Sequence, residues 1–256
     1  MKKETKKYIY FGVTAYLLFL IFTFPASRAW LLVRSNGLVA ADVVQLAGIS
    51  GSWWSGRASQ AIIRGRQLYE LSWSMKPLGL LTGKLKADVD FKPPEGTFSG
   101  VVGMGTDTVV VSDVKARIPL QLANQTLSAF GLQLGGSMNA DFECLRFEEK
   151  MLTAAEGTLV WQDARISVPQ ELLLGDIRAD LTNEEEQVMV RFADTGGPLI
   201  AEGVCSIKPD GSYTFNARLG VREGSQPELV DAVKVLGETG SDGKVTLNFS
   251  GKLPKL

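Results

Sequence analysis

Apolar and polar residues alternate in short stretches along most of the chain beyond residue 60, and this period of two constrains the fold most strongly. Successive side chains of a β-strand point to opposite faces, so such stretches predict strands with one apolar and one polar face. Clear examples are QAIIRGRQLYELSW (60–73), DTVVVSDVKARI, SMNADFECLRF, SYTFNARLGV and KVTLNFSGKL. The turn sequences at 195–198 (TGGP), 209–211 (PDG) and 242–243 (DG) favour tight connections between antiparallel neighbours. The acidic residues 184–186 after Asn183 predict a solvated turn. The chain is therefore predicted to be mainly β.

One seven-residue pattern occurs three times, as GKLKADV (83–89), GSMNADF (136–142) and GDIRADL (175–181). In a strand, the glycine and alanine of each copy share the apolar face, whereas Asp88, Asp141 and Asp180 belong to the polar face. General acid–base catalysis requires carboxylates held close together in a concave, partly dry site. The pattern therefore predicts sheet architecture rather than an acidic active site.

A few segments have helical character. Pro119 and Gly131 stand where a helix would start and stop, and the segment 226–240 places Leu229, Val233 and Leu236 at helical spacing. The segment 25–33 is expected to add a helical turn or two near the N-terminus.

No linker rich in Pro, Gly or Ser divides the rest of the chain. Residues 31–256 are therefore expected to form one continuous domain, a long, curved antiparallel β-sheet with a few short helices. A weak repeat leaves two duplicated β units as an alternative, because GSWWSGRAS (51–59) resembles GTLVWQDARIS (157–167).

The first 30 residues differ from the rest. Four lysines among the first seven residues precede an uncharged run of 17 residues from Tyr8 to Phe24, which Pro25 ends. A helix rises about 1.5 Å per residue, so this run just crosses the hydrocarbon core of a bilayer. Under the positive-inside rule, it predicts a cytoplasmic tail (1–7), a single transmembrane helix (8–24) and a domain (31–256) outside the inner membrane.

A cleavable signal peptide is the rival interpretation. Ser27 and Ala29 resemble the small residues of a cleavage site, but Arg28 lies between them and the apolar run is longer than a usual signal core. An uncleaved anchor is therefore preferred.

Composition excludes several classes of function. The formal net charge of −1 gives no electrostatic footprint for nucleic acid. The chain has no histidine, which removes the Ser-His-Asp and Cys-His arrangements and nearly every zinc site. Ser112 and Lys115 match the Ser-x-x-Lys spacing of serine acylases, but they lie in a strand-like run without the companion motifs. No catalytic residue, cofactor or metal site is predicted, and the chain is not expected to be an enzyme.

The two cysteines, Cys144 and Cys205, both follow the predicted anchor. In an oxidising compartment they could form a disulfide, which would stabilise the fold by about 4 kcal/mol on the chain-entropy model. Each also lies in a strand-like stretch, so two small core residues are the alternative.

Trp53 and Trp54 are adjacent in a β-rich context, where alternation sends them to opposite faces. One interpretation makes one of them a core residue and leaves the other half-exposed. The other makes the pair a contact surface for a partner protein or the bilayer, because tryptophan is favoured in both settings.

Several long stretches resemble the type II secretion system protein N family, most tellingly SGSWWSG and the run from Gly197 to Gly251. The repeated seven-residue strand pattern also resembles AsmA-like proteins, more weakly. The first resemblance implies one inner-membrane span, a β-rich periplasmic domain in a Gram-negative envelope, and contacts with other inner-membrane subunits of the secretion system. It implies no catalytic residue.

Three hypotheses follow. The first is a non-enzymatic accessory component of the type II secretion system, which exports folded periplasmic proteins across the outer membrane. The second is an AsmA-like envelope protein that holds or transfers lipid in the groove of a curved sheet. The third, an envelope enzyme, has no support from the residues.

Overall fold

The computed structural model of the protein describes residues 2–36, 44–63, 65–76, 79, 85–93, 96–105, 107–124, 133–168, 170–237 and 239–253. The chain divides into two compact units, Met1–Pro94 and Glu95–Leu256. The domain predicted for residues 31–256 thus contains parts of both units.

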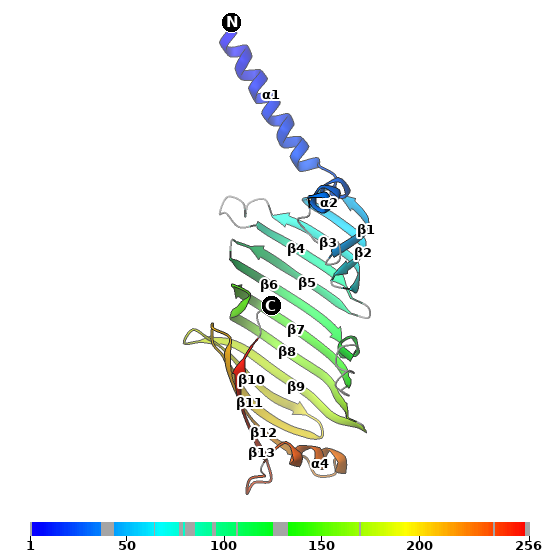
Figure 1. Ribbon diagram of the computed structural model, residues 1–256, viewed down its shortest axis with the longest axis vertical. Coiled ribbons are helices and arrows are strands. Elements are labelled where there is room, and N and C mark those ends of the chain that lie inside the picture. The colour runs from blue at the N-terminus through cyan, green and yellow to red at the C-terminus, as the bar shows by residue number, and fades with distance from the viewer. Residues whose placement is uncertain are drawn as a thin grey trace. The chain divides into compact units, whose positions relative to one another are not determined.

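The first unit begins with two helices, α1 (Lys2–Thr23) and α2 (Ala26–Ser35). Four antiparallel strands follow, each pairing with its neighbour in the chain: β1 (Val44–Gly51), β2 (Ser55–Ile63), β3 (Arg66–Lys76) and β4 (Leu85–Lys92) (Figure 1). The stretch from Gln60 to Trp73, expected from its alternation to be one strand, is divided between β2 and β3. The division falls at Gly65, whose φ of +79° suits a turn.

The second unit is a meander of nine strands, in which consecutive strands are antiparallel neighbours. They are β5 (Thr97–Met104), β6 (Thr108–Pro119), β7 (Gln133–Glu148), β8 (Met151–Val168), β9 (Gln170–Glu184), β10 (Gln187–Gly196), β11 (Leu199–Ile207), β12 (Ser212–Val221) and β13 (Val245–Lys252). The unit also contains the 3-10 turn η2 (Leu120–Ala123) and the helix α4 (Pro227–Val235).

Two-residue turns connect the long strands of the second unit. Glu149 and Lys150 have φ values of 47° and 68°, and Glu185 and Glu186 have values of 47° and 62°. Positive φ at both central residues is the conformation whose twist matches that of the flanking strands. The solvated turn expected at residues 184–186 is therefore confirmed.

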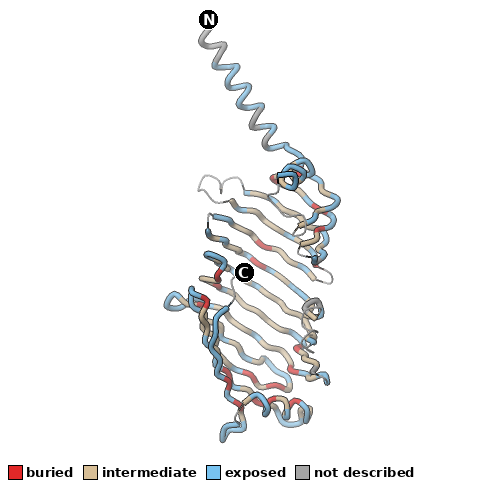
Figure 2. Tube along the Cα trace, in the orientation of Figure 1, coloured by how far each residue is buried: buried red, intermediate tan, exposed pale blue. Residues whose placement is uncertain are grey.

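The best-buried core of the described residues lies where α4 packs on the sheet. Leu229 and Val233 of α4 contact a cluster that includes Leu199, Ala217 and Val245. Figure 2 shows buried residues along this end of the second unit, and Figure 1 shows β10–β13 turned relative to β5–β9. The sheet of this unit is therefore curved, and α4 closes only one end of it.

The helix predicted at residues 226–240 is confirmed as α4, and the one at 25–33 as α2. Of the segment 119–131, the structure describes η2 and Asn124, and residues 125–131 lie outside the described residues. The run 8–24 is helical through Thr23 as part of α1. Within the described part of the chain, no helix combines the length and hydropathy that a membrane crossing requires.

The repeat considered for the sequence is not reproduced by the strands. Residues 51–59 contain the turn between β1 and β2, whereas residues 157–167 lie inside the single strand β8. Among the described residues, the two units also differ in size, with four strands in one and nine in the other. Local sequence likeness therefore does not extend to a duplicated architecture.

The buried face of α4 gives a prediction about stability. Leu229 is 1% exposed and Val235 on the same helix is 86% exposed. Leu229→Ala should lower the free energy of unfolding by about 2–5 kcal/mol, because it removes buried methyl groups and leaves a cavity. Val235→Ala is the matched control and should change it by no more than about 0.5 kcal/mol. Urea unfolding followed by circular dichroism measures both, and equal effects would contradict the packing of α4.

Candidate functional site

Trp53 and Trp54 lie in the turn between β1 and β2, beside the C-terminal end of α1. The Trp54 ring stacks on Phe22 of α1 at a centroid distance of 5.2 Å and contacts the Trp53 ring at 4.5 Å. The backbone amide of Trp53 donates to the carbonyl of Phe24 at 3.0 Å. These contacts hold the C-terminal end of α1 against the β1–β2 turn.

Trp54 is buried and Trp53 half-buried, as the first interpretation of the pair expects. The indole nitrogen of Trp54 has no hydrogen-bond partner among the described residues, and its burial therefore carries a desolvation cost. The packing of the Trp54 ring against Phe22 and Trp53 must outweigh that desolvation cost. A contact of this pair with a partner or the bilayer stays a prediction.

A third tryptophan, Trp73 on β3, completes this cluster. Its indole nitrogen donates to the carbonyl of Trp53 at 3.0 Å. Next to it, α2 and strands β1 and β3 enclose an apolar hollow of about 190 Å³. Its lining includes Ala26, Trp30, Ile49, Trp53, Trp73 and Met75. The sequence gives no direct sign of this hollow, because its walls come from segments far apart in the chain.

The second unit carries a continuous apolar face. Two rows of register partners cross it from β6 to β13, and partners in register point to the same side of a sheet. The Val114 row is Val114, Phe142, Gly157, Leu181, Val190, Cys205, Phe215 and Phe249; the Ala116 row is Ala116, Ala140, Leu159, Ala179, Phe192, Gly203, Ala217 and Leu247. We call these two rows the apolar face.

Most residues of the apolar face are only half-buried. Val114, Ala217 and Leu247 are buried, and the last two belong to the core beneath α4. Phe192 and Phe215 stack at 5.4 Å, and Phe249 follows at 6.2 Å with 54% of its area exposed. A Cβ at Gly203 would collide with the Phe192 ring, so glycine gives this aromatic row its space. Most of the apolar face therefore remains accessible.

The opposite face is mostly polar and carries charges of both signs. The row between the two apolar rows reads Lys115, Asp141, Thr158, Asp180, Arg191, Val204, Asn216 and Asn248. The hydrogen bond from Arg178, helped by one from Thr158, holds the pKa of Asp180 below its usual range against the opposing effect of burial. Opposite charges on neighbouring strands stabilise this face modestly.

The three repeated aspartates do not converge on one point. Asp141 and Asp180 are two strands apart in this polar row with Thr158 between them, and Asp88 of β4 pairs with Lys76 at 2.8 Å in the first unit. Among the described residues, no cluster of three His, Cys, Asp or Glu side chains could hold a metal ion. Ser112 and Lys115 lie inside strand β6, where a serine acylase motif would need a helix start.

The disulfide that was one of two alternatives for Cys144 and Cys205 is not formed in the structure. Both thiols are free, on β7 and β11, with three strands between them. Neighbouring strands are about 4.8 Å apart, and a disulfide requires Cα atoms within about 7 Å. Burial raises the pKa of Cys205, which lies on the apolar face. Both cysteines are half-buried, so neither belongs to the buried core that the alternative expected.

One polar cluster was not anticipated. Arg222, which follows β12, donates to the carboxylate of Asp194, to the carbonyl of Leu199 at 2.9 Å and to the carbonyl of Gly197. Asp194 also accepts from the backbone amide of Ala201 at 2.9 Å. The cluster ties the β10–β11 turn to the end of β12. The glycine-rich turn 195–198 is visible in the sequence, but nothing in the sequence predicts that Arg222 pairs with Asp194 beside it.

The described chain thus defines a mainly β protein whose second unit has one open apolar face and one charged face. The profile of the family "Type II secretion system (T2SS), protein N" matches residues 42–248, and the chain belongs to this family. The predicted resemblance is therefore confirmed.

Relatives from several bacteria agree with this membership, and each is named "Type II secretion system protein N". The Vibrio cholerae protein is 28% identical over 86% of this chain and 90% of its own length. The Klebsiella pneumoniae protein is 27% identical over 93% and 92%, and the Aeromonas hydrophila protein is 27% identical over 94% and 96%, respectively. No solved structure matches the chain.

The Asp194–Arg222 pair predicts a dependence of stability on pH. Burial acts to raise the pKa of Asp194, but the hydrogen bonds from Arg222 and the amides of Ala201 and Gly196 outweigh it, so the pKa lies below its usual range. The pair's contribution is thus present above the unfolded-state pKa of about 4 and lost as the pH falls through the folded-state pKa.

Asp194→Asn should lower the free energy of unfolding by about 1–3 kcal/mol near pH 7, and this difference from the unaltered protein should shrink below about pH 4. Urea titrations between pH 7 and pH 3 measure it. Asp231→Asn, at an exposed position of α4, is the control. A difference that stays constant at low pH would refute the assignment.

Proposed function

We propose that this protein is an accessory inner-membrane component of the type II secretion system. In this proposal it supports export of folded periplasmic proteins across the outer membrane through contacts with other inner-membrane subunits. The observation that carries it is the family match over residues 42–248. The protein contributes contacts rather than chemistry.

The anchor of this proposal is residues 8–24, with residues 1–7 in the cytoplasm and 31–256 in the periplasm. The uncharged run and the lysines before it support this topology. Large side chains on α1 are also exposed, among them Tyr8 (73%), Phe11 (76%) and Phe19 (62%). Such a helix surface is stable in contact with acyl chains, and its aromatic residues suit the edges of a bilayer.

The ring contacts among Phe22, Trp53 and Trp54 hold the end of the proposed anchor against the β1–β2 turn of the first unit. Because Phe22 stacks on Trp54, the strands start at a defined place relative to the end of α1. Trp53 and the apolar hollow beside α2 then lie close to the proposed membrane surface. This region is the proposed contact for the bilayer or a neighbouring subunit.

The secretion role predicts a defect in export. Deletion of the gene should leave exported proteins in the periplasm, and the unaltered gene should restore their release. A gene in which a cleavable signal peptide replaces residues 2–24 should restore less, because the strands are then no longer held at the membrane. Immunoblots of periplasm and medium measure each strain. Normal secretion by the deletion strain would refute the proposal.

A second candidate function is the holding of lipid on the apolar face. The observation that favours it is the accessibility of the Val114 and Ala116 rows, which α4 covers only at one end. Acyl chains gain about 25 cal/mol for each Å² of apolar area they cover. The apolar face extends over eight strands, β6 to β13, so an acyl chain can lie along it over a large apolar area.

Photo-crosslinking tests this second function with two neighbouring positions. A benzoylphenylalanine at Phe142 points to the apolar face, and one at Asp141 points to the polar face. In living cells, the first should form adducts with phospholipid, seen by mass spectrometry, at least about tenfold more than the second, because adjacent residues of a strand face opposite sides. Equal labelling, or no lipid adduct at Phe142, would exclude it.

A further inference from the structure

Strand β13 is the last strand in the sheet of the second unit, and its outer edge is mostly unpaired among the described residues. Its inner side pairs with β12 from Val245 to Lys252. On its outer side, the described residues provide a single bridge, between Thr239 and Val245. Natural proteins usually protect such edges with charges, prolines or bulges. From Val245 to Gly251, β13 carries none of these side chains.

The backbone groups that face outward can be identified from neighbouring hydrogen bonds. Gly240 donates its amide to the carbonyl of Lys244 at 2.8 Å, so this carbonyl points to the outer side. Backbone groups along a strand alternate in direction, so those of Asn248 and Ser250 also point outward. Leu253 agrees with this alternation, because its amide donates inward to Gly211. Asn248 and Ser250 therefore offer outward-facing donors and acceptors.

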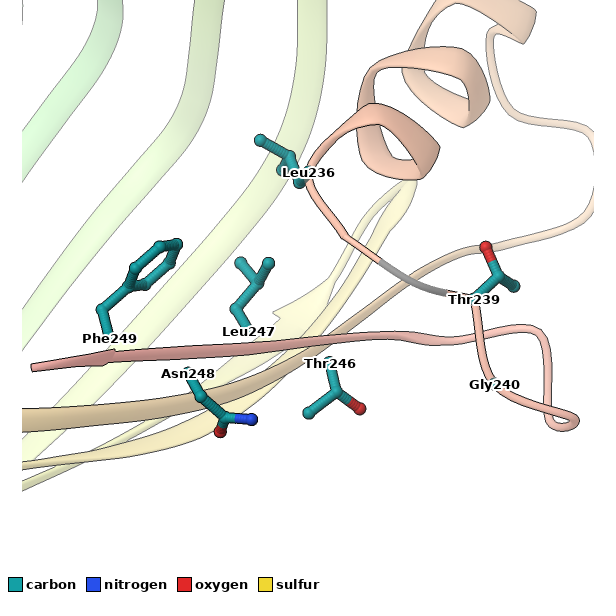
Figure 3. A pocket seen from close by; sticks show the side chains of 7 residues that line it. All are labelled: Leu236, Thr239, Gly240, Thr246, Leu247, Asn248 and Phe249. Atoms are coloured by element: carbon teal, nitrogen blue, oxygen red, sulfur yellow. The ribbon is translucent and has the colours of Figure 1, made fainter.

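Several side chains along this edge are also exposed to solvent. Figure 3 shows Leu247 and Phe249 on one side of β13 and Thr246 and Asn248 on the other. Phe249 and Leu236 are each 54% exposed and help to line a hollow of about 540 Å³. The edge therefore combines unpaired backbone with an exposed aromatic ring.

We propose that β13 pairs with β13 of a second copy of this chain, antiparallel and with the two-fold axis at Phe249. In this register Asn248 faces Ser250 of the copy and exchanges both backbone hydrogen bonds with it. Phe249 faces Phe249 of the copy in a non-hydrogen-bonded pair, where side chains approach most closely. Each outward backbone group named above then has a partner.

The side-chain pattern of β13 is complementary to itself in this register. All pairs join residues of the same parity, so Leu247 and Phe249 of both copies extend one apolar face. The paired residues are 247–251 of each copy, because the Thr239–Val245 bridge already occupies the outer side of β13 before them. No charged side chain lies between Leu247 and Gly251, so no like charges are opposed. A second copy therefore supplies a strand of the required alternation. This inference is independent of the secretion role.

Disulfide trapping tests the register. In a full-length chain with Cys144→Ala and Cys205→Ala, Phe249→Cys places two thiols opposite each other across the axis. Mild oxidation of native membranes should yield a covalent dimer at least about fivefold more abundant than with Asn248→Cys, because the matched control faces Ser250 instead of itself. No dimer with Phe249→Cys, or equal dimer with both variants, would overturn the proposal.

A second variant tests the edge without cysteines. Asn248→Pro removes an outward amide and leaves the pairing with β12 intact, because proline is tolerated where the N–H faces away from the sheet. Light scattering of the full-length chain in detergent should give the mass of two copies for the unaltered protein and for Asn248→Ala. It should give the mass of one copy for Asn248→Pro, with the same melting temperature. An unaltered protein that is monomeric, or Asn248→Pro that remains dimeric, would overturn the proposal.

Discussion

The register of the antiparallel strands is the constraint on which the rest of the second unit depends. Because side chains alternate with a period of two, a slip of one residue between two strands would exchange the faces of every side chain on one of them. The rows through Val114 and Ala116 stay apolar across eight strands, and the row through Lys115 stays almost entirely polar. Burial beneath α4 and charge pairing on the opposite face thus favour the same register.

This register also explains which part of the apolar face is buried in the core and which part remains half-buried. A sheet usually covers its apolar face with a second layer. Here α4 covers only the end near Leu174, Leu199 and Val245. The remaining apolar residues are half-buried by their neighbours in the sheet. The second unit therefore presents an extended apolar surface, in a chain that belongs to a family of secretion-system components.

Local signals in the sequence predicted local structure well. Alternation predicted strands such as β6 and β13, the spacing of Leu229 and Val233 predicted α4, and the acidic residues 184–186 predicted a turn. These features depend on residues a few positions apart. The assignment of the repeated aspartates to a polar face depends on the same short period, and their partners in the structure agree with it.

Features that depend on contacts between residues far apart in the chain could not be predicted from the sequence. The spacing of Cys144 and Cys205 could not show that three strands lie between them. The partner of Asp194 lies 28 residues away in Arg222, and the hollow beside Trp73 has walls from α2, β1, β3 and the turn at Trp53. The likeness between residues 51–59 and 157–167 failed for a related reason, because the same letters form a turn in one place and a strand interior in the other.

The meander of the second unit has a consequence for how the chain is made. Each strand from β6 to β12 pairs only with the strand before it and the strand after it in the chain. A polypeptide that emerges with its N-terminus first can therefore add one hairpin at a time, and no strand must wait for a partner synthesised much later. Low sequence separation between partners favours rapid folding. The core is completed near the end of synthesis, when α4 and then β13 emerge and bring Leu229, Val233 and Val245 together.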